Sequence, residues 1–266
     1  MGAISDVARI AMPDGVDLVI PMNGRQLRVP ASDPSIVPHM LRDRAWEPHL
    51  TRYLLRELKP TDVFVDVGAN LGYYVTMCAP RVARVIAFEP VTKNCRYCAL
   101  NIALNQLTNV ELHQMGLWHE EARLPLRGDL EGVNAAIAPS ADVAGPEFVR
   151  LAPLDALVAN GELPLSRLDV LKMDIEGAEV SSLIGMRRTI ARFRPRIVME
   201  LNPPMLSTFG KSIEDVWDLL RAFEYEIQAF EPWKEQDPVP VADLEALKRL
   251  CPPDGLVDIA AVGPMR

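Results

Sequence analysis

The sequence predicts an α/β protein built on a mostly parallel sheet with helices on both faces. Short apolar segments typical of buried strands alternate along most of the chain with segments of helical periodicity. Repeated strand–helix units of this kind form parallel sheets, because each helix packs back onto the sheet between neighbouring strands. Of the 266 residues, 49% are apolar and 24% are charged, as in ordinary globular proteins. We expect one α/β domain over residues 61–266, preceded by an extension over residues 1–60.

The sequence of the extension predicts a β-hairpin followed by a helix. Two β-like runs, residues 16–20 and 26–29, are separated by Asn23-Gly24, which is the strongest short hairpin signal. Leucines at helical spacing over residues 48–58 then predict an amphipathic helix. We expect this extension to act as a lid over a site or as a contact in a homodimer.

The repeating units begin at residues 63–67, a continuous apolar run of the kind found in buried parallel strands. The further strands are expected at residues 85–88, 110–113, 168–173, 196–201, 226–230 and 256–262. The helices are expected at residues 73–79, 93–104, 154–158, 178–193 and 213–223. The segment 117–153 predicts a hairpin with strands at 124–126 and 148–151. Its long loop, 128–146, is of a length that usually carries function.

Composition excludes several classes of protein. The chain has 28 Lys and Arg against 36 Asp and Glu, and this net charge of −8 argues against a nucleic-acid partner. No apolar run is long enough to span a bilayer and no signal peptide is evident, so we expect a cytoplasmic protein without a membrane partner. Cys95 and Cys98 form a C-x-x-C without a second pair, which predicts buried thiols rather than a zinc site.

The most informative segment runs Asp66-Val-Gly68-Ala-Asn70-Leu-Gly72, between the first strand of the repeat and its helix. Gly68 and Gly72 permit a tight turn and a close approach of the backbone to a ligand. The helix that follows offers free N–H groups to an anion. Asp66 ends the strand, where open α/β sheets bind ligands. The alternative interpretation is a plain strand-to-helix turn capped by Asp66.

A second acidic residue narrows the choice of ligand. Glu89 ends the next strand, where a carboxylate accepts hydrogen bonds from ribose hydroxyls. A dinucleotide site needs a glycine where this chain has Asn70, and Asp66 would repel a pyrophosphate. Asp66 could instead bind the ammonium of a methionyl group. S-adenosylmethionine is therefore favoured over NAD, and an NAD-type oxidoreductase and a non-catalytic adenosyl-binding module remain the alternatives.

Three segments together resemble the FkbM family of S-adenosylmethionine-dependent methyltransferases. They are Asp66-Val-Gly-Ala-Asn-Leu-Gly72, Phe88-Glu-Pro90 and Leu171-Lys-Met-Asp-Ile-Glu-Gly-Ala-Glu179. The resemblance covers about residues 63–202. It implies a Rossmann-like class I methyltransferase fold with a seven-stranded sheet, whose last two strands form a reversed hairpin at residues 226–230 and 256–262. It also implies the cofactor-binding residues, which would be Asp66, Gly68, Asn70, Gly72, Glu89, Asn94, Gly116, Leu117 and Asp174.

Methyl transfer to a hydroxyl needs alignment of the reactants and removal of a proton. Asp174 is the best candidate base, because it ends a strand at the point where the sheet reverses direction. Glu200, at the end of the next strand, and His119, after the third strand, are further catalytic candidates. Glu176 and Glu179 begin a helix, where the alternative role is a favourable charge at the helix N-terminus.

The acceptor and the metal are predicted more coarsely. The resemblance implies O-methylation of a small molecule, a sugar or a secondary metabolite. Asp174 with Glu200 or Asn202 could bind Mg²⁺ through oxygen ligands, but the resemblance does not imply a metal, so a divalent ion is not favoured.

Overall fold

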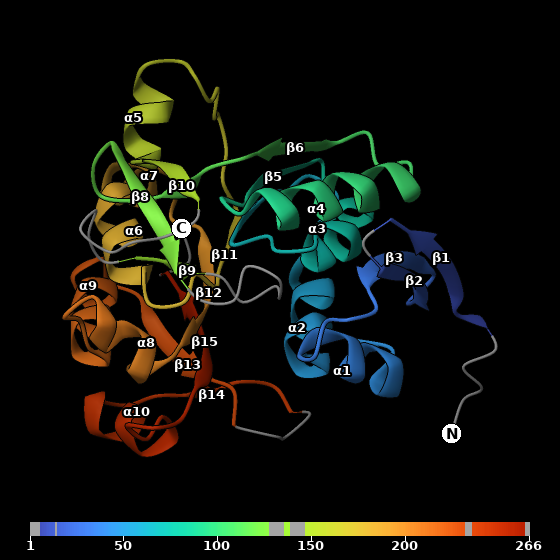
Figure 1. Ribbon diagram of the computed structural model, residues 1–266. Helices are drawn as coiled ribbons and strands as arrows, with labels where there is room; N and C mark the ends of the chain where they lie inside the picture. The colour runs from blue at the N-terminus through green and yellow to red at the C-terminus, as the bar shows by residue number, and fades with distance from the viewer. Residues whose placement is uncertain (1–5, 14, 128–135, 139–146, 232–235, 264–266) are drawn as a thin grey trace.

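The structure is a computed structural model that describes residues 6–13, 15–127, 136–138, 147–231 and 236–263. Within these residues an eight-stranded sheet forms the centre of the molecule (Figure 1). Its strands in spatial order are β14 (Val239–Pro240), β13 (Glu226–Ala229), β15 (Val257–Val262), β12 (Arg196–Leu201), β11 (Val170–Met173), β4 (Val63–Val67), β5 (Arg84–Phe88) and β6 (Val110–His113). The predicted α/β fold with a mostly parallel sheet is confirmed.

The sheet reverses direction at one side only. Strands β12, β11, β4, β5 and β6 pair in parallel, whereas β15 pairs antiparallel with both β12 and β13. This is the reversed pair that the sequence predicted. The two-residue β14 adds an eighth strand to the predicted seven.

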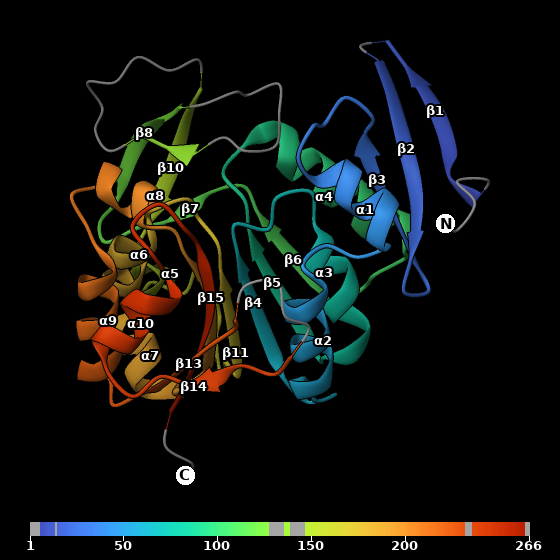
Figure 2. The same ribbon diagram turned by 90° about the horizontal axis from the view of Figure 1, so that it is seen from below.

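Helices cover both faces of the sheet (Figure 2). One face carries α1 (Ile36–Asp43), α2 (Pro48–Glu57), α3 (Tyr73–Cys78) with the short 3-10 turn η2 (Ala79–Arg81), and α4 (Thr92–Leu104). The other carries α5 (Leu154–Ala159), α6 (Glu179–Gly185), α7 (Arg187–Phe193), α8 (Pro203–Thr208), α9 (Ile213–Ala222) and α10 (Leu244–Leu250). Alternate residues of β4 pack into the two hydrophobic clusters, Val65 on one face and Phe64 on the other, as the strand pleat requires.

The helix predicted over residues 178–193 is instead two helices, α6 and α7, which meet at Met186. Asp155 explains the break, because its carboxylate accepts hydrogen bonds from the backbone N–H groups of Arg188 and Thr189, both at 2.8 Å. These groups begin α7, and a carboxylate at a helix start stabilises a new N-terminus. The sequence prediction also missed α1, α8 and α10.

The extension forms a three-stranded antiparallel sheet of β1 (Ala8–Met12), β2 (Gly15–Met22) and β3 (Arg25–Pro30), and α1 and α2 follow it. The predicted hairpin is confirmed at Asn23-Gly24, where both residues have positive φ. Strand β1 was not predicted. Buried apolar side chains of the extension share one hydrophobic cluster with β4, β5 and α3, so the core continues across residue 60.

A smaller four-stranded sheet lies beside the main one. It consists of β7 (Gly116–Leu117), β10 (Phe148–Ala152), β8 (Ala122–Arg127) and β9 (Ala136–Ile137). The antiparallel pair β8–β10 confirms the predicted hairpin. Most of the predicted loop 128–146 lies outside the described residues, which include only 136–138 of it. Across the described ranges, no helix is both long enough and apolar enough to cross a bilayer.

Candidate active site

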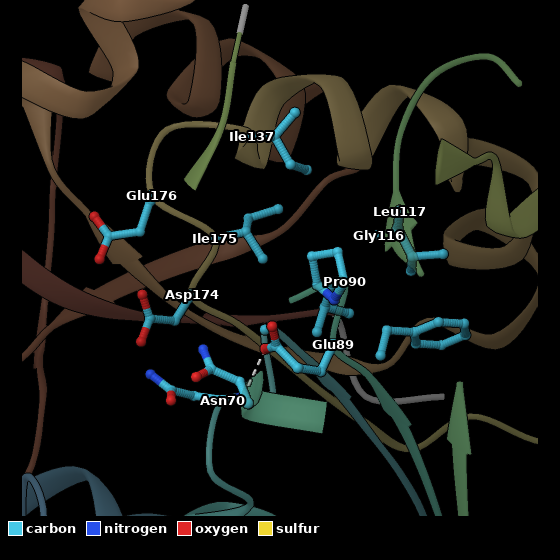
Figure 3. Close-up of a pocket in the computed structure, with 13 residues that line it drawn as sticks. Asn70, Glu89, Pro90, Gly116, Leu117, Ile137, Asp174, Ile175 and Glu176 are labelled. Atoms are coloured by element: carbon cyan, nitrogen blue, oxygen red, sulfur yellow. Dashed lines mark hydrogen bonds between the residues drawn. The ribbon is translucent and has the colours of Figure 1, made fainter. Parts of the chain in front are cut away.

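A cavity opens at the carboxyl ends of β4, β5 and β11, and we call it the first cavity (Figure 3). Ile137 and Glu176 belong to its lining. Seven of the nine residues predicted to bind the cofactor also line it: Gly68, Asn70, Glu89, Asn94, Gly116, Leu117 and Asp174. The motifs are far apart in the sequence and meet here because parallel strands end at the same edge of the sheet.

The two glycines of the loop after β4 have different structural roles. Gly68 has φ +82°, and a Cβ there would lie 1.9 Å from the backbone oxygen of Asp174. Gly72 has φ +83°, and a Cβ there would lie 2.7 Å from Sγ of Cys98 on α4. Gly68 therefore lets two loops of the site touch, whereas Gly72 lets α3 pack on α4 and does not line the first cavity.

Glu89 is fixed by the backbone around it. Its Oε2 accepts a hydrogen bond from the backbone N–H of Asn70 at 2.7 Å, and its Oε1 accepts one from Val91 at 2.9 Å. Burial raises the pKa of Glu89 to about 7, although these two hydrogen bonds oppose the shift. Each carboxylate oxygen keeps acceptor capacity for a further donor. Glu89 is thus held in one orientation and able to accept hydrogen bonds from hydroxyl groups.

Asp66 lies beneath the first cavity rather than in its wall. It is fully buried, and among the described residues neither of its carboxylate oxygens has a hydrogen-bond partner. The ammonium of Lys172 lies 3.8 Å from its Oδ1 and 3.4 Å from Oδ2 of Asp174. Burial raises the pKa of Asp66 to about 6. Burial opposes the charge of Lys172, but Asp174 and Asp66 raise its pKa, so Lys172 stays protonated between them.

A second cavity of about 240 Å³ adjoins the first and shares Gly68, Asn70, Asp174 and Glu176 with it. The strand β12 contributes Glu200, the residue after its end is Asn202, and β11 contributes Lys172. The extension contributes Ser35, Ile36, Met40, Trp46 and Glu47 to the wall. Asp174, Glu200 and Asn202, which were predicted as neighbours, thus face one cavity.

The structure does not bring His119 to either cavity. Its side chain is 40% exposed, and its ion-pair partner is Glu120, 3.6 Å away. Glu176 lines both cavities, whereas the carboxylate of Glu179 accepts hydrogen bonds from the backbone of Ile175 and Gly177. Glu179 therefore stabilises the turn before α6.

Sequence reasoning missed a cluster of three carboxyl groups. Oxygens of Glu47, Glu200 and Asp258 lie within 4.8 Å of one another. The Tyr74 hydroxyl donates a hydrogen bond to Glu47 at 2.6 Å, and His49 Nε2 lies 2.8 Å from Asp258. Burial, followed by repulsion from neighbouring carboxylates, raises the pKa of both Glu47 and Glu200.

Sequence signals for the two new members of this trio were weak. Glu47 lies in the extension, outside every motif, with a left-handed backbone at φ +42°. Asp258 is opposite Glu200 in the β12–β15 register. The only hint was a charged residue in an otherwise apolar strand. The four cysteines are buried and free, as predicted for Cys95 and Cys98.

Comparisons with known proteins identify the family of the chain. The family model of the Methyltransferase FkbM domain matches residues 66–227. Hexuronic acid methyltransferase AglP of Haloferax volcanii is 29% identical over 150 residues, which are 56% of this chain and 60% of AglP. AMB antimetabolite synthetase AmbE of Pseudomonas aeruginosa is 28% identical over 211 residues, 64% of this chain and 10% of AmbE. The crystal structure of methyltransferase FkbM from Methylobacillus flagellatus KT has a TM-score of 0.51 at 17% identity, and the match covers 85% of this chain and 52% of that one.

The fold and the family model together define a methyltransferase with a Rossmann-like α/β fold. The family model covers more than half of the chain, so the protein belongs to the FkbM methyltransferase family. The resemblance expected from the three sequence segments is confirmed. The chain spans about three fifths of AglP and a tenth of AmbE.

Proposed function

We propose that the protein transfers a methyl group from S-adenosylmethionine to a hydroxyl of a small molecule, sugar or secondary metabolite. The observation that carries this proposal is the pair of cavities that share a wall at Gly68, Asn70, Asp174 and Glu176. Reactants bound in these two adjoining cavities would lie next to each other at the residues that both cavities share. This is the proximity that group transfer needs.

The residues of the first cavity fit an adenosyl group. Glu89 accepts hydrogen bonds from hydroxyls, and Gly116 and Leu117 offer an apolar surface across the cavity from Asp174 (Figure 3). When bound, S-adenosylmethionine supplies a methyl group on a positively charged sulfur. The first cavity measures about 60 Å³, room for a few water molecules, so binding of an adenosyl group requires this cavity to widen.

We assign proton removal to Asp174. It lines both cavities, and Lys172 holds one of its oxygens. Glu200 faces the same cavity, but its raised pKa keeps it protonated near neutral pH, so it donates a hydrogen bond to the acceptor rather than taking a proton. A metal is not part of this proposal, because Asp174 already pairs with Lys172.

Two observations bear on the acceptor. The extension lines part of the second cavity through residues between 35 and 47, so this segment helps to select the acceptor. AglP is named as a hexuronic acid methyltransferase, which supports a sugar among the proposed acceptor classes. The net charge of −8 favours a small acceptor over a nucleic acid, and we place the enzyme in the cytoplasm.

Calorimetric titration with S-adenosylhomocysteine and, separately, with NAD⁺ tests the proposal. We expect micromolar binding of S-adenosylhomocysteine and none of NAD⁺, because Asn70 with φ +51° occupies the position where a pyrophosphate needs a glycine. Binding of NAD⁺ alone would support an oxidoreductase instead. Binding of S-adenosylhomocysteine without methyl transfer to any member of a broad hydroxyl panel would favour a non-catalytic adenosyl-binding module.

A further inference from the structure

A third cavity of about 470 Å³ continues the second one, and we call it the outer cavity. The two cavities share Asn202 and Leu256. Asn202 follows β12 and Leu256 precedes β15, so the outer cavity extends along the carboxyl edge of the sheet, away from the first cavity. The three cavities therefore follow one another in the order first, second and outer.

The two parts of this path differ in chemistry. Lys172, Asp174 and Glu200 face the second cavity, whereas Phe230, Leu250, Pro252, Leu256 and Val257 give the outer cavity its apolar lining. Leu256 is 52% exposed, and it lies at the boundary between the two cavities. Among the exposed large apolar side chains of the described residues, it is the one that lines them.

Carboxyl groups stand on both sides of the boundary. Glu47 and Glu200 face the second cavity, and Asp258, within 4.8 Å of them, faces the outer one. Among the residues that line the second cavity, Lys172 is the one with an ammonium group, and it already pairs with Asp66 and Asp174, so an anionic ligand would meet no unpaired positive charge there. Hydroxyl groups, which donate hydrogen bonds, suit carboxyl acceptors instead.

We propose that the acceptor has two parts: an uncharged hydroxylated head in the second cavity and an apolar group in the outer cavity. This inference rests on the proposed methyl transfer and adds the acceptor's chemical class to it. The head places its hydroxyl beside Asp174, and the apolar group passes Leu256 to contact Phe230 and Leu250. The occupant of the outer cavity is thus part of the acceptor molecule.

Calorimetry with simple glucosides tests the proposal, in the presence of saturating S-adenosylhomocysteine. The probes are n-octyl β-D-glucopyranoside, kept below its micelle concentration, methyl β-D-glucopyranoside and the anionic n-octyl β-D-glucuronide. We expect the octyl glucoside to bind at least about tenfold more tightly than the methyl glucoside, because each buried methylene adds affinity. The octyl glucuronide should bind about tenfold more weakly than the octyl glucoside, because its carboxylate would be buried without an unpaired cation beside it.

The variant Leu256→Ser tests whether the apolar group of the acceptor passes Leu256 to reach the outer cavity. It should weaken binding of the octyl glucoside about fivefold, the value for losing part of one leucine contact, and change the methyl glucoside less than about twofold. Leu104→Ser is the matched control, because Leu104 is 37% exposed on α4 and lines neither cavity. It should change neither affinity.

Three results would overturn this inference: no binding of the octyl glucoside, equal binding of the octyl and methyl glucosides, or equal weakening by the two leucine variants. Tighter binding of the glucuronide would overturn the uncharged head. Affinity for S-adenosylhomocysteine, measured on all three proteins, separates these failures from failure of the proposed function. If the wild-type protein did not bind S-adenosylhomocysteine, the proposed methyl transfer itself would be overturned.

Discussion

At the scale of single residues, the candidate site has two layers: side chains that line the first cavity, and the buried pair of Asp66 and Lys172 behind them. Asn70 and Glu89 line the first cavity, as their positions at strand ends predicted. Asp66 was expected to face the ligand, but it is buried beside Lys172. A strand-end motif predicts which edge of the sheet a residue reaches. Such a motif does not predict the direction of the Asp66 side chain, which pairs with Lys172, a residue over 100 positions further along the chain.

Gly68 offers the sharpest test at this scale. In Gly68→Ala the new Cβ would lie 1.9 Å from the Asp174 carbonyl oxygen, so the loops must separate. We expect the free energy of unfolding in urea to fall by at least about 3 kcal/mol. Gly161→Ala is the matched control, because Gly161 also has positive φ, +79°, but a Cβ added there would meet no atom within 4 Å. It should lose only about 1 kcal/mol. Equal losses in the two variants would show that the loop contact is unimportant.

At the scale of elements, the sequence pattern predicted the longer strands of the main sheet and the long helix α4, whereas contacts with other elements set the helix breaks. The α6–α7 break depends on Asp155, which the pattern over residues 178–193 does not include. Helix α8 begins with Pro203-Pro204 after an Asn202 cap and is only six residues long, too short for a periodic signal. These short elements form where tertiary contacts outweigh local propensity.

The attachment of the extension can be tested through Asn101 on α4. This buried side chain accepts a hydrogen bond from the Arg28 backbone N–H and donates to the carbonyl oxygens of Arg28 and Leu71. In Asn101→Ala these groups lose their partner, so we expect unfolding free energy to fall by roughly 3 kcal/mol in a urea titration. Binding of S-adenosylhomocysteine should also weaken, since Leu71 belongs to the loop after β4.

Asn105 supplies the control for that experiment. It exchanges an equivalent pair of hydrogen bonds with the backbone of Gln26, but at an exposed position where water can replace it. Asn105→Ala should therefore cost under about 1 kcal/mol. If both asparagine variants lost the same stability, the buried link between α4 and the extension would not be what holds the extension in place.

At the scale of the whole molecule, the division into an extension and a domain describes the sequence better than the packing. Composition and pattern changed near residue 60, but the hydrophobic cluster of α1, α2 and α3 crosses that point. Long-range packing of this kind leaves no local signal. The carboxyl trio escaped prediction for the same reason, because its members come from three separate segments.

Burial of carboxyl groups gives the whole molecule a pH-dependent stability. Burial raises the pKa of Glu179 from 4.5 to about 7 and that of Glu89 likewise, while Asp66 rises to about 6. An acid whose pKa is higher in the folded state stabilises that state below its unfolded pKa. This stabilisation is lost as pH rises through the folded pKa. We therefore expect the free energy of unfolding to fall between about pH 4 and about pH 7.

Glu179→Gln isolates one contribution to this fall. Glutamine keeps an oxygen for the Ile175 and Gly177 N–H groups but cannot ionise. The variant should match the wild type near pH 4 and exceed it by roughly 3 kcal/mol at pH 8, measured by urea unfolding. Glu120→Gln, at a side chain 69% exposed, should follow the wild-type curve at every pH. A Glu179→Gln curve parallel to the wild type would contradict the prediction.

The shared wall between the first and second cavities has a thermodynamic consequence. Gly68 and Asp174 touch backbone to backbone, and both line the two cavities. Widening the narrow first cavity therefore shifts the floor of the second. We therefore expect occupancy of one cavity to change the affinity of the other, and by linkage the factor is identical in both directions. The proposed methyl donor and acceptor should then bind cooperatively rather than independently.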